Sequence, residues 1–174
     1  MDYSKFTIKT QEALQDASSL AMQGDYPEIN PLHMLLALLN QEDGLVSPVI
    51  ENVGVNPNKL SSEIKKLLDT FPKVSGSANI YMSQELQKII SKAENEMTFL
   101  KDQYLSTEHI LLSMTESSGA VGNILRQSGV THDSVLKALK SVRGNQTVDS
   151  NDPESKSSTL EKFTRDLTAM ARQD

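Results

Sequence analysis

Two histidines, His33 and His109, are the ionisable residues whose placement most suggests chemistry, because they lie 76 residues apart in similar surroundings. If they met beside a carboxylate such as Glu108, the imidazoles and the carboxylate together could transfer protons or bind a metal ion. The alternative is that each histidine lies in the first turn of a buried helix and hydrogen-bonds the loop beside it. A residue duplicated along a chain usually serves the architecture, so we favour the second interpretation.

Three polar residues near predicted helix ends form a different candidate. Thr7, Asp102 and Glu108 flank elements that adjoin the apolar pair Ile89–Ile90. Thr7 is a suitable N-cap, and a carboxylate in a first helical turn, such as Glu108, offsets the helix macrodipole. The same residues could form the polar rim of a binding groove, and the sequence leaves both interpretations open.

Catalytic motifs are missing from the sequence. The chain has no cysteine, which excludes thiol catalysis and cysteine-based zinc sites. No G-x-x-x-x-G-K-[ST], H-E-x-x-H or G-x-S-x-G pattern occurs. We therefore expect no catalytic residue, no cofactor and no metal in this chain, and an enzyme built on His33 and His109 ranks last.

The composition narrows the choice of partners. The 174 residues include 17 Lys and Arg against 23 Asp and Glu, for a net charge of −6 and a pI near 5.1. Such acidity disfavours nucleic acid as a partner. The N-terminus does not resemble a signal peptide, and the longest apolar run, 34–39, is far shorter than the roughly 20 residues that cross a bilayer. We expect a soluble, cytoplasmic protein without a membrane partner.

Apolar residues recur at helical spacing along the chain, and no alternating segment of useful length indicates a strand. The breaks between periodic stretches carry residues that begin helices, several of them followed by proline. The expected N-caps are Thr7, Asn30, Ser47, Asn56, Ser83, Ser106 and Thr131. A further short helix is framed by Gly119 and Gly129. The fold is predicted to be all-α.

The chain also repeats itself. A shift of 76 residues aligns His33 with His109, and after a one-residue slip a shift of 75 aligns Gly54 with Gly129. We expect two pseudo-symmetric four-helix repeats, about 1–72 and about 80–144, that share an interface in one globular domain spanning 1–144.

The composition changes after the second repeat. Residues 145–158 are mostly Asn, Ser, Thr and Asp, with Val148 as the only large apolar residue, and this pattern predicts a solvated, flexible linker. Helical spacing resumes in 159–174, which we expect to be a short helical segment that is poorly ordered alone.

Residues 30–44 (NPLHMLLALLNQEDG) and their echo at 106–112 (STEHILL) resemble the duplicated N-terminal repeat of the Clp unfoldases, ClpA, ClpC and ClpB, of the AAA+ class. The tail at 143–148 and 160–168 is similar to the ClpB branch, in which it joins this domain to the first nucleotide-binding domain. The resemblance covers essentially the whole chain. It implies that 159–174 begin that nucleotide-binding domain.

The resemblance implies a module of a hexameric, ATP-driven chaperone that extracts unfolded or aggregated polypeptides together with the DnaK chaperone system. ATP and Mg²⁺ would be bound by the parent protein outside this chain. The chain itself, expected to be a monomer in isolation, would bind polypeptide and catalyse nothing. The alternative is an adaptor-docking domain of a ClpA- or ClpC-type unfoldase.

The family's client groove lies between the first helix and the second repeat. Carried onto this chain, its residues are Thr7, Ile90, Asp102, Glu108 and His109. Ile90 would supply apolar surface, while Thr7 and the two carboxylates would hydrogen-bond an extended client. His109 would lie beside them.

Overall fold

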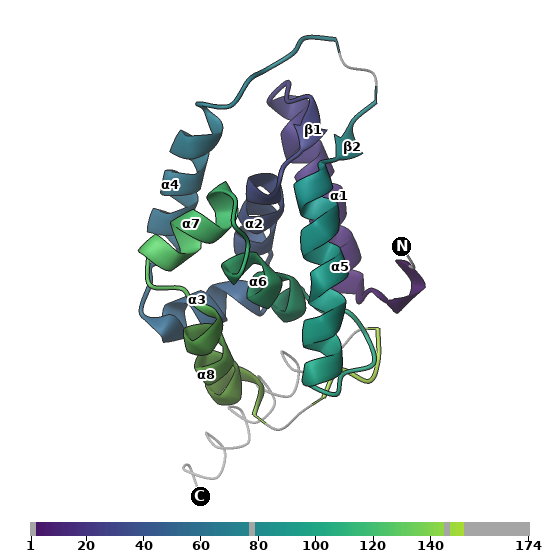
Figure 1. Cartoon of the computed structure of the whole chain (residues 1–174), viewed down its shortest axis with the longest axis vertical. Coiled ribbons are helices and arrows are strands. Elements are labelled where there is room, and N and C mark those ends of the chain that lie inside the picture. Colours follow the sequence, from purple (N-terminus) through teal and green to yellow (C-terminus); the bar gives the residue numbers. More distant parts are fainter. Residues whose placement is uncertain (1–2, 77–78, 145–146, 152–174) are drawn as a thin grey trace, which may run out of the picture.

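The computed structural model describes residues 3–76, 79–144 and 147–151, and in this part the chain forms eight α-helices and two short strands (Figure 1). The first half contains α1 (Ile8–Gln23), β1 (Glu28–Ile29), α2 (Pro31–Asn40), α3 (Val46–Val53) and α4 (Pro57–Leu68). The second half contains β2 (Tyr81–Met82), α5 (Gln84–Phe99), α6 (Thr107–Thr115), α7 (Ala120–Gln127) and α8 (His132–Arg143). The predicted all-α fold is confirmed. The helical segment expected at 159–174 lies outside the described residues.

Most helices begin where the sequence indicates. Thr7 and Ser83 accept backbone N–H groups of the first turns of α1 and α5, and Asn30 and Asn56 do the same for α2 and α4. The prediction for α3 is wrong, because the helix begins at Val46 and Ser47 lies inside it. The Ser47 hydroxyl instead donates to the Leu39 carbonyl at 2.7 Å and ties α3 to the end of α2.

The two halves follow the same helical plan. α5 starts 76 residues after α1, α6 starts 76 after α2, and α8 starts 75 after α4. Gly54 and Gly129, which follow α3 and α7, both have positive φ, at 105° and 94°. Only glycine adopts this backbone conformation freely, so the same residue type ends the third helix of each repeat.

Each repeat donates a short extended segment to the other. β1 of the first repeat pairs in parallel with β2 of the second, with Ile29 opposite Met82. The symmetry-related bridge joins Phe6 of the first repeat to Leu105 of the second, also in parallel. The first residues of each repeat therefore pair with the extended residues before the second helix of the other repeat. Two such backbone pairings join the two repeats.

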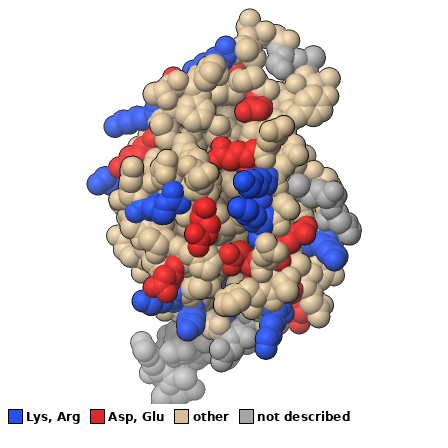
Figure 2. All heavy atoms as spheres, viewed as in Figure 1, with Lys and Arg blue, Asp and Glu red and all other residues tan. Residues whose placement is uncertain are grey.

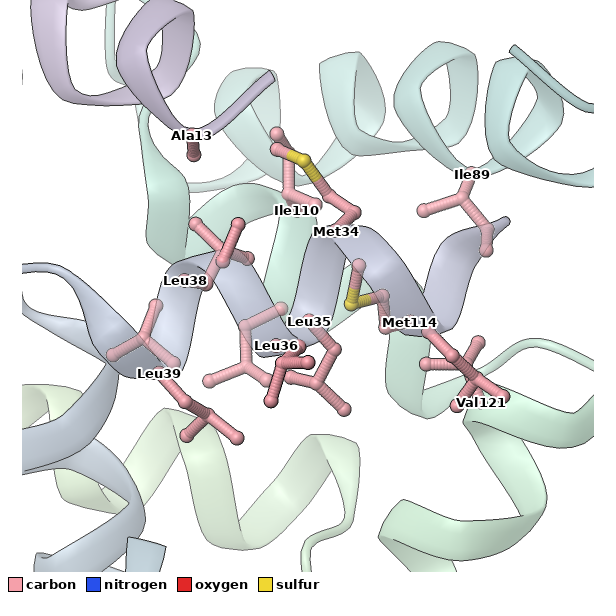
Figure 3. Close-up of a cluster of buried hydrophobic side chains, with 14 of the residues drawn as sticks. Ala13, Met34, Leu35, Leu36, Leu38, Leu39, Ile89, Ile110, Met114 and Val121 are labelled. Carbon is pink, nitrogen blue, oxygen red and sulfur yellow. The ribbon is translucent and has the colours of Figure 1, made fainter. Parts of the chain in front are cut away.

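The core is aliphatic and centres on α2, whose residues 31–39 are all buried. Figure 3 shows side chains of this helix, including Met34, Leu35 and Leu38, among residues from other helices such as Ile110 of α6 and Ile89 of α5. α6 is likewise buried along its whole length. A helix that is buried on every side must be surrounded by other elements, so the remaining helices form a shell around α2 and α6.

The surface carries mixed charge. On the face shown in Figure 2, Lys and Arg are interspersed with Asp and Glu, and no continuous basic tract crosses this face. Among the described residues, no helix combines the length and apolarity needed to cross a membrane.

Candidate functional site

The candidate site lies where the α5–α6 turn meets the beginnings of α1 and α6. α5 ends in a tight reversal in which Lys101 has a φ of 60° and the Asp102 N–H donates to the Met97 carbonyl at 2.9 Å. This reversal directs the Asp102 side chain inward, where it is 6% exposed. Ser106 then begins α6 with an extended backbone conformation. A short turn therefore brings Asp102 close to the first turn of α6.

Asp102 is the centre of a buried polar network. Its Oδ2 accepts a hydrogen bond from Nε2 of His109 at 2.6 Å. Its Oδ1 accepts the Val148 N–H at 2.7 Å and forms an ion pair with Arg143 at the end of α8. Burial alone raises the Asp102 pKa, but the bonds from His109, Arg143 and Val148 outweigh it and bring the pKa below its ordinary value of 3.8.

The imidazole of His109 is neutral and holds Asp102 in position. Its Nδ1 accepts the Ser106 N–H at 2.8 Å and therefore carries no proton. Nε2 must then hold the ring proton, which it donates to Asp102. The imidazole is fully buried, so its two nitrogens link the start of α6 to the α5–α6 turn.

Glu108 brings a second carboxyl group to the site. The side chain is fully buried, and neither carboxylate oxygen has a hydrogen-bond donor among the described residues. Its Oε2 lies 3.9 Å from Nη1 of Arg143, so one guanidinium is shared between Glu108 and Asp102. Two carboxylates beside one cation leave acceptors that can bind the N–H groups of a ligand.

The start of α1 forms the other wall. The Thr7 N–H donates to the Leu105 carbonyl at 3.0 Å, and its Oγ1 accepts the Thr10 N–H at 3.2 Å. The Thr10 hydroxyl also donates to the Leu105 carbonyl, at 3.1 Å. This threonine pair holds the start of α1 against the strand residue that precedes α6.

Residues 147–151 cover the site. The Val148 carbonyl accepts the N–H of Gln103 at 2.8 Å and that of Tyr104 at 3.3 Å, and the Asn151 carbonyl accepts the Ile8 N–H at 2.7 Å. The Val148 side chain is only 3% exposed. The expectation of a solvated linker therefore does not hold for Val148, because main-chain hydrogen bonds to a distant turn compensate for the polar composition around it.

The Clp repeat (R) N-terminal domain family matches residues 5–128, a stretch that includes both histidines and the start of α6. The chain belongs to this family. The chaperone protein ClpB of Bacillus cereus is 37% identical over 99% of this chain and 20% of its own length. The chain thus spans about a fifth of the length of the curated relatives it matches.

Solved structures of Clp repeat domains share the fold. The Hsp104 N-terminal domain from Candida albicans gives a TM-score of 0.74 at 22% identity, with 84% of this chain and 97% of that one covered. A ClpV N-domain, solved in complex with a VipB peptide, gives a TM-score of 0.65 at 17% identity, with coverage of 82% and 89%. At these identities the likeness establishes the fold alone.

The structure brings four of the five expected site residues together in this Clp repeat domain. Asp102, Glu108 and His109 form the network, and Thr7 lies next to it through Leu105. Ile90 is fully buried in the core of α5, so it offers no surface to a ligand in this conformation. All five side chains are buried, whereas a groove floor and rim would be open.

Arg143 and Val148, which complete the network, were not among the site residues predicted from the sequence. Arg143 gives no local signal, because a cation in the last turn of a helix is common. A depression of about 480 Å³ between the end of α5 and α8 was not predicted either. It is lined by apolar residues such as Phe99 and Leu136 and by charged residues such as Lys137 and Arg143. Phe99 is 69% exposed there. The position of Phe99 at the end of a helix, next to Leu100, was the sequence feature that could have indicated this depression.

The two histidines have matching structural roles. His33 accepts the Asn30 N–H at Nδ1, at 2.9 Å, as His109 does with Ser106. Each is the third residue of its helix and completes a capping box. The interpretation of the pair as architectural is confirmed. Among the described residues, no group of three or more His, Asp or Glu side chains is arranged to hold a metal ion.

Proposed function

We propose that this Clp repeat domain binds unfolded or aggregated polypeptide for an ATP-dependent protein disaggregase and passes it to the ring pore. One observation carries the proposal: three backbone N–H groups, those of Ile8, Gln103 and Tyr104, and the Asp102 carboxylate already bind the main chain of residues 148–151. Contacts to main-chain atoms do not depend on sequence, and a domain that receives many different unfolded chains needs that property.

Neighbouring features suit the same ligand. The Glu108 oxygens, which have no donor in the part of the chain that the structure describes, can take further N–H groups of an extended chain. The depression beside Phe99 and Leu136 can take an aliphatic or aromatic side chain. The neighbouring ClpV domain, whose structure contains a VipB peptide, shows that this fold can hold a peptide. The parent protein would supply ATP, Mg²⁺, the hexameric ring and cooperation with the DnaK system in the cytoplasm.

The binding should be weak. Burying one client Leu or Phe side chain contributes about 1.5–3 kcal/mol, and ordering a flexible chain opposes part of this. A single domain should therefore bind with a Kd between about 1 μM and 1 mM. Several domains in one ring would raise the effective concentration, and a low intrinsic affinity would let the client be handed on.

An NMR titration of the labelled chain with a permanently unfolded protein, such as reduced and carboxymethylated α-lactalbumin, tests the proposal. Shifts should cluster at Ile8, Gln103 and Tyr104, and Glu108→Gln should weaken binding about threefold to tenfold, about the effect of one lost hydrogen bond. Glu116→Gln is the matched control, since it makes the same change at an exposed position at the end of the same helix.

The alternative function is docking of a folded adaptor, as expected for a ClpA- or ClpC-type unfoldase. No shifts at saturating unfolded protein, together with shifts on addition of a folded adaptor of such a machine, would replace the proposal with this alternative. Binding unaffected by Glu108→Gln, in a variant that keeps its fold, would remove Glu108 from the site.

A further inference from the structure

The segment that covers the candidate site is bound as a ligand would be. Residues 147–151 (Figure 1, yellow-green) place the Val148 N–H on Asp102 and the Val148 carbonyl on the N–H groups of the α5–α6 turn. Three residues later the Asn151 carbonyl accepts the Ile8 N–H at the start of α1. One short stretch of main chain therefore connects both walls of the site.

The site contacts the main chain of residues 147–151 and buries one of their side chains. Val148 is buried, whereas the side chains of Thr147, Asp149 and Asn151 are exposed. The described contacts with the α5–α6 turn and α1 are otherwise made by backbone atoms. An extended polypeptide with an aliphatic residue in the Val148 position could form the same set of bonds in place of this segment.

The first repeat has a comparable segment after its fourth helix. After α4 the chain also folds back on the turn between the first two helices, where the Val74 N–H donates to the Asp25 carbonyl at 2.7 Å. That segment leads into β2, which is hydrogen-bonded to β1, so it is fixed as part of the architecture. In the second repeat the equivalent segment rests on the residues of the candidate site, including Asp102 of the charged network.

We propose that residues 147–151 are an internal ligand of this site, which a bound polypeptide must displace. The proposal rests on the polypeptide-binding function above. Four hydrogen bonds and one aliphatic side chain hold the segment, and the entropy of ordering five residues opposes them. The closed and open states therefore compete, and the apparent Kd for polypeptide equals the intrinsic Kd divided by the open fraction.

The full chain carrying Val148→Asp tests the proposal, because a buried carboxylate at the residue that bonds Asp102 would expel the segment. Reduced, carboxymethylated α-lactalbumin should bind this variant about fivefold to tenfold more tightly than the original chain, as the open fraction rises. Asn151→Asp is the control. It adds the same charge to the same segment on an exposed side chain, and it keeps the carbonyl that binds Ile8.

Hydrogen exchange supplies a measurement that does not depend on the variant. In the original chain the unfolded protein should reduce protection of the Val148 amide. Protection of the Leu105 amide should stay unchanged, because this amide donates to the Lys5 carbonyl and not to the segment. A synthetic peptide of residues 145–153 should compete for the Val148→Asp chain, and the same peptide with Val148→Asp should not.

The outcomes separate this inference from the function on which it rests. If the original chain binds, Glu108→Gln weakens binding, and the Val148 amide stays protected in the complex, the internal ligand is refuted and the binding function stands. An open Val148→Asp chain that binds no tighter than the original also refutes the internal ligand alone. If neither chain binds at saturating concentrations while exchange shows the segment released, both proposals fail.

Discussion

The two repeats use the same position for opposite chemistry. Tyr26 and Asp102 occupy equivalent places after the first helix of each repeat, and each reaches the last residue of its own fourth helix. Tyr26 donates its hydroxyl to the Leu68 carbonyl at 2.9 Å, whereas Asp102 pairs with the Arg143 guanidinium. The neighbours differ in the same way, since Leu32 of α2 is replaced by Glu108 in α6.

The histidines follow the same division. His33 packs against the Tyr26 ring, with centroids 4.6 Å apart and ring planes at 65°, and its Nε2 has no partner among the described residues. His109 uses the equivalent Nε2 to hold Asp102. We call the contact between the turn after the first helix and the end of the fourth helix the closure of a repeat. The closure is neutral and aromatic in the first repeat and a buried ionic network in the second. Function is expected where the polar version replaced the apolar one, because buried charge adds little stability by itself.

The largest expected effect is the loss of stability when the closure of the second repeat is broken. Asp102→Asn removes the carboxylate that offsets Arg143 inside the protein and should lower the free energy of unfolding by about 3–5 kcal/mol. Tyr26→Phe removes one neutral hydrogen bond at the equivalent position and should cost about 1 kcal/mol. Urea denaturation of the two variants measures the difference. Equal losses would show that the two closures are energetically alike.

A second effect, on the pH dependence of stability, distinguishes His33 of the first repeat from Asp102 of the second. Burial lowers the His33 pKa from 6.5 to about 4, so between these values the unfolded chain binds a proton that the folded chain excludes. The contribution of His33 to stability is complete above pH 6.5 and is lost as the pH falls to 4, by about 3 kcal/mol in total. The Asp102 contribution, from a pKa below 3.8, is lost only at lower pH.

Denaturation curves measured from pH 7 to pH 4 test this assignment. His33→Gln keeps an acceptor for the Asn30 N–H, as in an ordinary capping box, and removes the titrating ring. Stability of this variant should change little over that range. An unchanged slope would assign the pH dependence to groups other than His33.

The smallest effect concerns Glu108. Glu108→Leu copies the residue of the first repeat and removes two buried oxygens that have no donor among the described residues, so the free energy of unfolding should rise by about 1–2 kcal/mol. Affinity for unfolded polypeptide should fall at the same time. Thermal denaturation and the NMR titration measure the two changes. A less stable variant would show that Glu108 is needed to neutralise Arg143.

The sequence predicted the architecture well because the signals for it are local. N-caps and the glycine ends of helices each depend on a few adjacent residues, and the 76-residue repeat is visible as short segments that match one another. The structure confirms the helices and the paired roles of His33 and His109. The start of α3 was missed because the Ser47 hydroxyl bonds the end of another helix.

The site was harder to predict because its contacts are long-range. Asp102 meets Arg143 and Val148 from 41 and 46 residues away, and no local pattern signals either contact. Charged side chains such as Glu108 are rarely fully buried, so an exposed rim was the natural expectation. Polar neighbours likewise concealed the burial of Val148. The resemblance supplied the right region, and only the three-dimensional packing showed that the region is closed.

The exchange of strands between the repeats also determines when the fold can be completed during synthesis. Phe6 pairs with Leu105, so the beginning of the chain waits for a partner made 99 residues later. At about 5–20 residues per second on a ribosome, that wait lasts roughly 5–20 s. Thr7, at the start of α1, obtains its bond to Leu105 only then. A nascent chain that has produced only the first repeat therefore cannot form this site, which is complete only once the second repeat has been made.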